Sequence, residues 1–153
     1  MSSANVWFES LVRWHKVVVW IAVPVVVVGV VAWVGVSSLS SGNLCGNEKL
    51  AELPSPDGAF KAVVFERDCG ATTGFSTQVS VMRRDAVLGN SGGNVFVEDS
   101  DHGRAPSGSG GGPEAKVVWM GNRAMRIDHH VKARVFVARQ LVDGVPVTYS
   151  TFQ

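Results

Sequence analysis

The sequence predicts one N-terminal transmembrane α-helix followed by a small all-β extracytoplasmic domain, built as an antiparallel sandwich or a curled sheet. Three observations predict this fold class: a long apolar segment near the N-terminus, about seven short strand patterns with tight turns, and two cysteines that follow the apolar segment. A chain of 153 residues has room for one globular domain. We expect a cytoplasmic or interfacial segment at 1–16, the helix at 17–36, a flexible tether at 37–49 and the β-rich domain at 50–153.

The apolar segment, residues 17–36, contains no charged side chain. At about 1.5 Å per residue, a helix of this length spans the roughly 30 Å hydrocarbon core of a bilayer. The segment exceeds the usual apolar region of a signal peptide, although small residues near Ser38 leave signal-peptidase cleavage as an alternative. Most of the tryptophans lie near the expected membrane interfaces, namely Trp7, Trp14, Trp20 and Trp33.

Basic residues are placed asymmetrically around the apolar segment. Arg13 and Lys16 precede it, whereas a single basic residue, Lys49, lies between it and the first expected strand after the turn. Because basic residues are retained on the cytoplasmic side, we expect the N-terminus in the cytoplasm and the domain outside it. Membrane lipid is then the partner of residues 17–36.

Two cysteines, Cys45 and Cys69, both follow the apolar segment. In an exported domain such a pair predicts a disulfide. A crosslink that closes a loop of about 25 residues stabilises a fold by roughly 3.5 kcal/mol in the chain-entropy model. Two unpaired buried thiols are the alternative.

Strand patterns and turn signals alternate through the rest of the chain. Ser55-Pro56-Asp57-Gly58 is a strong turn signal, because proline presets one backbone angle and glycine accepts an unusual one. Gly121-Asn122-Arg123 and Asp143-Gly144 predict the turns of two hairpins. Runs rich in β-branched and aromatic residues predict strands at 59–66, 77–83, 94–98, 115–120, 124–128, 133–141 and 145–151.

The segment from Asp99 to Glu114 differs in composition from the strands around it. It holds five glycines, two prolines and three serines. Such a segment buries too little apolar surface to order itself, so we expect a mobile loop.

Charge in the domain is balanced, with twelve basic and twelve acidic residues from Cys45 onward. A protein without net positive charge has no field that attracts a phosphate backbone, so we expect no nucleic-acid partner. Several basic residues gather in the last third, where we expect them to face solvent. Contact with anionic lipid or a wall polymer is the alternative for this group.

Three segments carry a resemblance to a known group of proteins: Ser55 to Gly58 (SPDG), Lys61 to Ser80 (KAVVFERDCGATTGFSTQVS) and Gly93 to Gly103 (GNVFVEDSDHG). In these segments, which cover about half of the domain, the chain resembles an uncharacterised family of small bacterial membrane-anchored or exported proteins. The resemblance implies a bacterial envelope setting only. Together with the orientation expected from the basic residues, it predicts that the domain lies on the periplasmic side of the cytoplasmic membrane. It implies no activity and no catalytic residue.

Hydroxyl groups are concentrated between two glycines in the segment from Cys69 to Gln78. Glycines permit unusual backbone angles, and a loop of this kind suits a ligand. The alternative is a plain turn whose hydroxyls bond their own backbone. The candidate binding loop comprises Gly70, Thr72, Thr73, Gly74, Phe75 and Ser76.

Asp101 and His102 form a candidate metal pair, because carboxylate and imidazole suit zinc or manganese. Asp99 and either His129 or His130 would have to complete the ligand set. The adjacent histidines point to opposite faces of a strand, so one site does not readily use both. Acidic residues in a glycine-rich loop are more often simply solvated.

The sequence favours a non-enzymatic envelope module that binds another envelope protein or a surface polymer through the 69–78 loop, with the 99–114 loop as a second contact. We expect no cofactor and no catalytic residue. The alternative is a metal-dependent or hydroxyl-nucleophile hydrolase centred on Asp101 and His102. A structural subunit that binds through its transmembrane helix is a third hypothesis.

Overall fold

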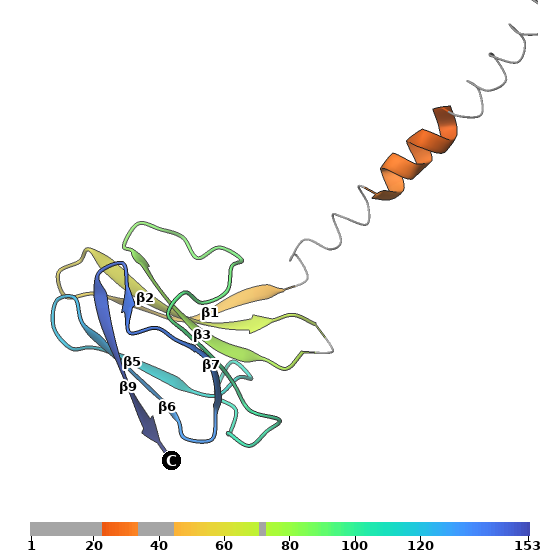
Figure 1. The fold of residues 1–153 in the computed structure, drawn as a ribbon. Helices are drawn as coiled ribbons and strands as arrows, with labels where there is room; N and C mark the ends of the chain where they lie inside the picture. The colour runs from red at the N-terminus through yellow and green to blue at the C-terminus, as the bar shows by residue number, and fades with distance from the viewer. Residues whose placement is uncertain (1–22, 34–44, 71–72) are drawn as a thin grey trace, which may run out of the picture. The chain divides into compact units, whose positions relative to one another are not determined.

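The computed structural model describes residues 23–33, 45–70 and 73–153 (Figure 1). The chain divides into two compact units, Met1–Gly42 and Asn43–Gln153. In the first unit, residues 23–33 form a helix. Within the described ranges, no helix has both the length and the apolar character needed to cross a membrane. The rest of the predicted helix at 17–36, the 1–16 segment and the first part of the tether lie outside the described residues.

The second unit is an all-β sandwich, which confirms that part of the predicted fold class. Its two sheets have the strand orders β1-β2-β3-β4-β7 and β5-β6-β9-β8. The domain starts slightly earlier than expected, because residues 46–49 of the predicted tether belong to the first strand. The strands are β1 (Gly46–Pro54), β2 (Phe60–Asp68), β3 (Ser76–Arg83), β4 (Phe96–Asp99), β5 (Ala115–Trp119), β6 (Met125–His130), β7 (Arg134–Ala138), β8 (Leu141–Val142) and β9 (Val145–Phe152).

Alternating apolar residues build the core between the two sheets. Ala62 and Val64 of β2 face Val117 and Ile127 of the other sheet in one buried cluster. The five-stranded sheet is antiparallel throughout. The strands predicted at 59–66, 77–83 and 94–98 are confirmed as β2, β3 and β4 within two residues at each end, because turn signals bound these apolar runs, whereas the run predicted at 133–141 ends as β7 at Ala138.

The four-stranded sheet departs from the wholly antiparallel prediction. Strands β6 and β9 pair in parallel, with Met125 opposite Val147. The predicted hairpin at 133–151 keeps its turn at Asp143-Gly144, where β8 pairs with β9. Its first arm, however, joins the other sheet as β7 and pairs with β4. The chain therefore crosses from one sheet to the other and back between β6 and β9, which is the connection that a parallel pair requires.

Both faces of β3 are covered, whereas alternation in this strand predicted that it would be half-buried. Gln78 and Ser80, on the face away from the core, are as buried as the core residues, with 5% of each exposed. The backbone of the segment between β3 and β4 bonds to both: Gly93 donates to Gln78 Oε1 (2.6 Å) and Asn94 donates to Ser80 Oγ (3.2 Å). This segment lies over the outer face and hides the polar side chains from water.

The glycine-rich segment expected to be a mobile loop instead follows a defined course. Ser107 and Pro113 form an isolated β-bridge, and Gly108 N donates to Gly112 O (2.7 Å). Thr77 Oγ1 donates to Pro113 O (2.5 Å), which ties the loop to the centre of the five-stranded sheet. The composition of the loop gives it few apolar side chains to bury, so its order comes from the hydrogen bond and the packing against β3.

Gly112→Ala is expected to lower the free energy of unfolding by about 1 to 3 kcal/mol. A Cβ at this position would lie 2.5 Å from Thr77 Oγ1 and 2.8 Å from Thr77 N, so the backbone itself must move. Thermal unfolding of Gly112→Ala and of the unchanged protein under the same conditions measures this loss of stability. Gly108→Ala is the matched control in the same loop, because its Cβ would meet nothing closer than 3.4 Å. Equal melting temperatures for the two variants would contradict this packing.

Candidate functional site

A groove of about 520 Å³ lies on the outer face of the five-stranded sheet, beside the segment that covers Gln78. One rim comes from the loop between β2 and β3, where Thr73, Gly74 and Phe75 lie. The opposite rim includes His102, from the turn after β4, and Phe136 of β7. The 69–78 and 99–114 segments, which were expected to contribute to one binding function, therefore both line this groove.

A row of polar side chains crosses four strands at the floor of this groove. Arg67 of β2 pairs with Ser76 of β3, and Ser76 pairs with Asp99 of β4. Asp99 in turn pairs with Arg134 of β7. Residues directly opposite in a sheet point to the same face, so the register aligns the four side chains. The row carries a cation at each end and one carboxylate between them.

Asp99 and Arg134 form the closest ion pair in the groove. Arg134 donates to the carboxylate twice, from Nε (3.2 Å) and Nη2 (2.5 Å). Burial opposes ionisation of Asp99, but the hydrogen bonds from Arg134 and from the backbone of Asp101 outweigh it and hold its pKa below the usual value. The pair is therefore charged at neutral pH and leaves little net charge at this end of the groove.

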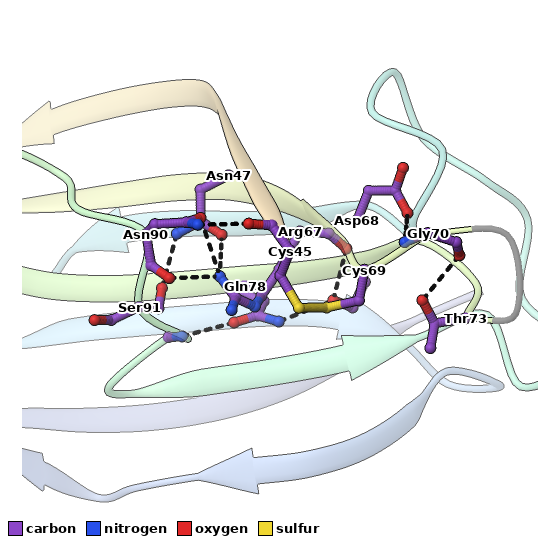
Figure 2. Close-up of a disulfide and its surroundings, with 12 residues drawn as sticks. Cys45, Asn47, Arg67, Asp68, Cys69, Gly70, Thr73, Gln78, Asn90 and Ser91 are labelled. Atoms are coloured by element: carbon purple, nitrogen blue, oxygen red, sulfur yellow. Dashed lines mark hydrogen bonds between the residues drawn. A yellow bond between two sulfur atoms is a disulfide. The ribbon is translucent and has the colours of Figure 1, made fainter. Parts of the chain in front are cut away.

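The disulfide predicted between Cys45 and Cys69 is present (Figure 2), and its Cys69 lines the groove. Gly46 and Asp68 are paired residues of β1 and β2, so the two cysteines close this strand pair where it ends. Asn90 Nδ2 donates to Cys45 O (2.5 Å), which brings the segment between β3 and β4 to the disulfide.

Arg67 links the disulfide region to the groove (Figure 2). Its Nη1 donates to Asn47 Oδ1 (2.6 Å) and to Asn90 O (3.0 Å). Asn47 also donates to the backbone oxygen of Ser91 (2.7 Å). These contacts join strand β1, strand β2 and the covering segment, so the groove floor is held by a network rather than by one side chain.

Two phenylalanine rings stand at the rims of the groove, and both are exposed. Phe75 is 45% exposed and Phe136 is 56% exposed. On β7, Val137 and Val135 are the partners of Val97 and Glu98, so Phe136 is the extra residue of a β-bulge. Bulges redirect a side chain at the edge of a sheet. This bulge therefore accounts for a large apolar ring that faces solvent at the groove.

Asp101 and His102 occupy a tight left-handed turn after β4, with φ of 46° and 58°. Asp101 N donates to Asp99 Oδ1 (2.8 Å), and an Asp side chain of this kind stabilises such a turn. Asp101 also forms an ion pair with Arg104 (2.8 Å). Across the described parts of the chain, no three His, Cys, Asp or Glu side chains are grouped to hold a metal ion. Metal binding by Asp101 and His102 stays a prediction.

The candidate binding loop contributes most of its described members to the groove. Thr73, Gly74, Phe75 and Ser76 line it. Gly70 makes the turn at φ 96°, accepting from Thr73 N (3.0 Å) and Thr73 Oγ1 (3.1 Å), while Thr72 lies outside the described residues. Sequence reasoning missed Arg67, Arg134 and Phe136 as members of the site, because they reach the groove through pairing between strands, which leaves no local signal in the sequence.

The hydroxyl groups of the groove bond to backbone or amide groups. Ser76 Oγ donates to Arg67 O (3.2 Å) and accepts from Gln78 Nε2 (2.8 Å). Ser100 Oγ accepts from Gly103 N (3.3 Å), and Thr73 is held by Gly70. A nucleophilic hydroxyl needs a base that takes its proton. These contacts instead orient the hydroxyls as fixed hydrogen-bonding groups.

Glu98 and His129 form a second polar site, inside the sandwich. Glu98 is fully buried on β4, and its Oε2 lies 3.7 Å from His129 Nδ1 on β6. Among the described residues, neither carboxylate oxygen of Glu98 nor this nitrogen has a hydrogen-bond partner. Burial raises the pKa of Glu98 to about 8, and the negative charge of neighbouring Asp99 adds to the shift. Glu98 is therefore mostly protonated at neutral pH.

Comparisons with protein families, curated proteins and solved structures found no match to this chain. The resemblance noted in the sequence accordingly stays a prediction. The geometry of the groove is the basis for a functional proposal.

Proposed function

We propose that this is a single-pass membrane-anchored envelope protein whose β domain binds another envelope protein or a surface polymer through the groove. The observation that carries the proposal is that two loops, from 69–76 and 99–103, meet over a row of fixed polar side chains with two exposed rings at the rims. Pockets with a few oriented polar groups and aromatic walls are typical of binding sites. The proposal includes no catalytic residue and no cofactor.

The membrane anchor and its orientation belong to the same proposal. Residues 23–33 are helical, and the valines in them and Trp33 are each more than half exposed, so the helix is apolar on all sides. A helix that is apolar all round suits a lipid environment. The disulfide suits an oxidising compartment, which supports the proposal that the domain lies on the periplasmic side of a bacterial cytoplasmic membrane. Lipid is then the partner of residues 17–36.

Binding is preferred to hydrolysis because the groove hydroxyls already bond to backbone and amide groups. A nucleic-acid partner is not proposed, because three of the arginines in the last third of the chain are neutralised. Arg123, Arg126 and Arg134 pair with Asp57, Asp128 and Asp99. A surface whose cations are paired attracts phosphate weakly.

A photo-crosslinking residue at position 136 is expected to capture a discrete partner in carbonate-washed membranes. Phe136 is exposed at the groove, so a bound molecule lies within reach of its side chain. The matched control is position 120, where Met120 is equally exposed (55%) in the turn after β5 and does not line the groove. Gel electrophoresis and mass spectrometry identify the adducts.

A discrete adduct at position 136 and none at position 120 supports the proposal. Equal labelling from both positions contradicts the proposed groove, and labelling from neither position contradicts a protein partner there. Loss of the full-length chain from the carbonate-washed pellet contradicts the anchor, because a spanning helix resists that wash.

A further inference from the structure

Each of the two exposed rings of the groove is backed on one side by the protein. The backbone of Gly111 lies against Phe75 so closely that a Cβ there would be 2.8 Å from the ring. The guanidinium of Arg134 lies over the ring of Phe136, 4.9 Å from its centroid. A ring supported in this way and still about half exposed presents a flat, fixed apolar surface to a ligand.

Between the rings, the groove offers hydrogen-bond donors and acceptors in similar measure. Arg67 and Gln78 supply donors, and Asp99 supplies acceptors. The Ser100 hydroxyl can donate its proton, whereas Ser76 Oγ, which already donates to Arg67 O, can only accept. A ligand that satisfies this mixture must itself both donate and accept at closely spaced positions. Hydroxyl groups do so, because each is a donor and an acceptor.

The charges around the groove argue against a strongly charged polymer. Arg134 is paired with Asp99, so Arg67 is the one cation of the polar row without a carboxylate in that row. On its other side, Phe75 borders a shallow depression that carries Glu48, Glu66 and Asp68. An anionic chain laid across Phe75 would meet these carboxylates.

The edge of the sheet argues against an extended peptide. Strand β7 lies at the end of the five-stranded sheet, where a peptide would add as a further strand. The bulge at Phe136 interrupts the regular spacing of backbone groups on β7, and the charged Arg134 lies at its start. Both features are devices by which proteins block strand addition.

We propose that the groove takes an uncharged saccharide chain, an inference that rests on the proposed binding function. Phe75 and Phe136 stack on the C–H faces of sugar rings, whose partial positive charge is attracted by the negative face of an aromatic ring. The polar row from Arg67 to Arg134 bonds the sugar hydroxyls. Because carboxylates border Phe75 and Arg134 is already paired, the groove favours a neutral glycan over an anionic one.

The test is calorimetric titration of the full chain in phospholipid nanodiscs, which avoids the sugar headgroups of maltoside detergents. The neutral probes are cellohexaose, the hexamer of β-1,4-linked N-acetylglucosamine, dextran and mannan. The acidic probe is polygalacturonate. At least one neutral probe is expected to bind with an affinity that changes less than twofold between 50 and 500 mM salt, because few charges are neutralised on binding.

Paired variants separate ring stacking from plain apolar contact. Phe136→Leu keeps an apolar side chain but removes the flat ring, and it is expected to weaken binding roughly tenfold. Phe136→Tyr keeps the ring and is expected to bind like the unchanged protein. Phe75→Leu and Phe75→Tyr are expected to behave in the same way, whereas Met120→Ala, outside the groove, leaves the affinity unchanged. Disulfide content and circular dichroism confirm that each variant is folded.

Failure of the saccharide inference is distinguishable from failure of the proposed function. Binding of polygalacturonate alone, with affinity that falls as salt rises, overturns the inference in favour of an anionic polymer. No saccharide binding up to millimolar concentration, together with a discrete protein adduct from position 136, overturns it in favour of a protein partner. Retention of affinity in both leucine variants overturns the stacking geometry. Absence of both saccharide binding and any adduct removes the binding function itself.

Discussion

Glu98→Gln is expected to stabilise the domain by a few kcal/mol at pH 8 and to remove most of the pH dependence of its stability between pH 5 and pH 8. Glu98 is fully buried, and the nearest basic atom, His129 Nδ1, lies at 3.7 Å, which is longer than a hydrogen bond. Negative charge here is costly, because the carboxylate is fully buried, has no hydrogen-bond partner among the described residues and lies beside charged Asp99. Glutamine has the shape of the protonated acid and carries no charge.

The sign of the pH dependence follows from the number of protons bound by Glu98 in the folded and the unfolded chain. Burial raises the pKa of folded Glu98 from 4.5 to about 8, so folded Glu98 holds its proton in a pH range where the unfolded chain has lost it. The free energy of unfolding therefore falls by about 1.4 kcal/mol for each pH unit between these values. The stabilisation is complete below pH 4.5 and is lost as the pH rises through 8.

Urea unfolding at pH 5, 6, 7 and 8 measures the difference between Glu98→Gln and the unchanged protein. The two curves are expected to agree near pH 5 and to separate steadily above it. Glu114→Gln is the matched control, because the Glu114 side chain is 58% exposed and its replacement removes a surface carboxylate. Parallel curves at every pH would show that Glu98 does not titrate in this range.

Reduction of the disulfide is expected to lower the free energy of unfolding by about 3.5 kcal/mol, a large part of the stability of a small domain. Cys45 and Cys69 are 24 positions apart, and the crosslink restricts the unfolded chain over that loop. In the folded protein it closes the β1–β2 pair at the end where Asn90 and Arg67 hold the covering segment. The groove floor therefore loosens together with the strand pair.

Urea unfolding with and without reductant measures this loss. The double variant Cys45→Ser/Cys69→Ser is expected to unfold at the midpoint of the reduced protein and to show no further change when reductant is added. An unchanged midpoint for the unmodified chain under reducing conditions would contradict the stabilising role. A further shift of the double variant would indicate that reductant acts elsewhere.

Local signals predicted much of the fold. The SPDG turn and the Asp143-Gly144 turn lie where expected, since each depends on the backbone preferences of a few neighbouring residues. The hairpin of β5 and β6 was predicted for the same reason. The pairing of Cys45 with Cys69 was predicted because the domain was expected to be exported and contains two cysteines.

Contacts between distant segments were not predictable in this way. The sequence did not indicate that β7 leaves its hairpin partner for β4, which creates the Asp99–Arg134 pair and turns Phe136 outward. Nor did it indicate that the segment between β3 and β4 covers Gln78. The candidate site was therefore predicted in part: the 69–78 loop, Asp99 and His102 were named, and Arg67, Arg134 and Phe136 were not.

By itself, the sequence determined the uncharged apolar segment, the balanced charge of the domain, its turns and its cysteine pair, because these depend on composition and on short-range backbone preference. The tertiary structure alone decided which strands became neighbours, the groove that this order creates on the outer face, and the enclosure of Glu98 with His129. Strand pairing joins residues far apart in the chain, and its free energy comes from the burial of both faces of a sheet at once. Alternation of side chains along one strand shows which residues share a face, whereas the identity of the covering segment depends on the whole fold.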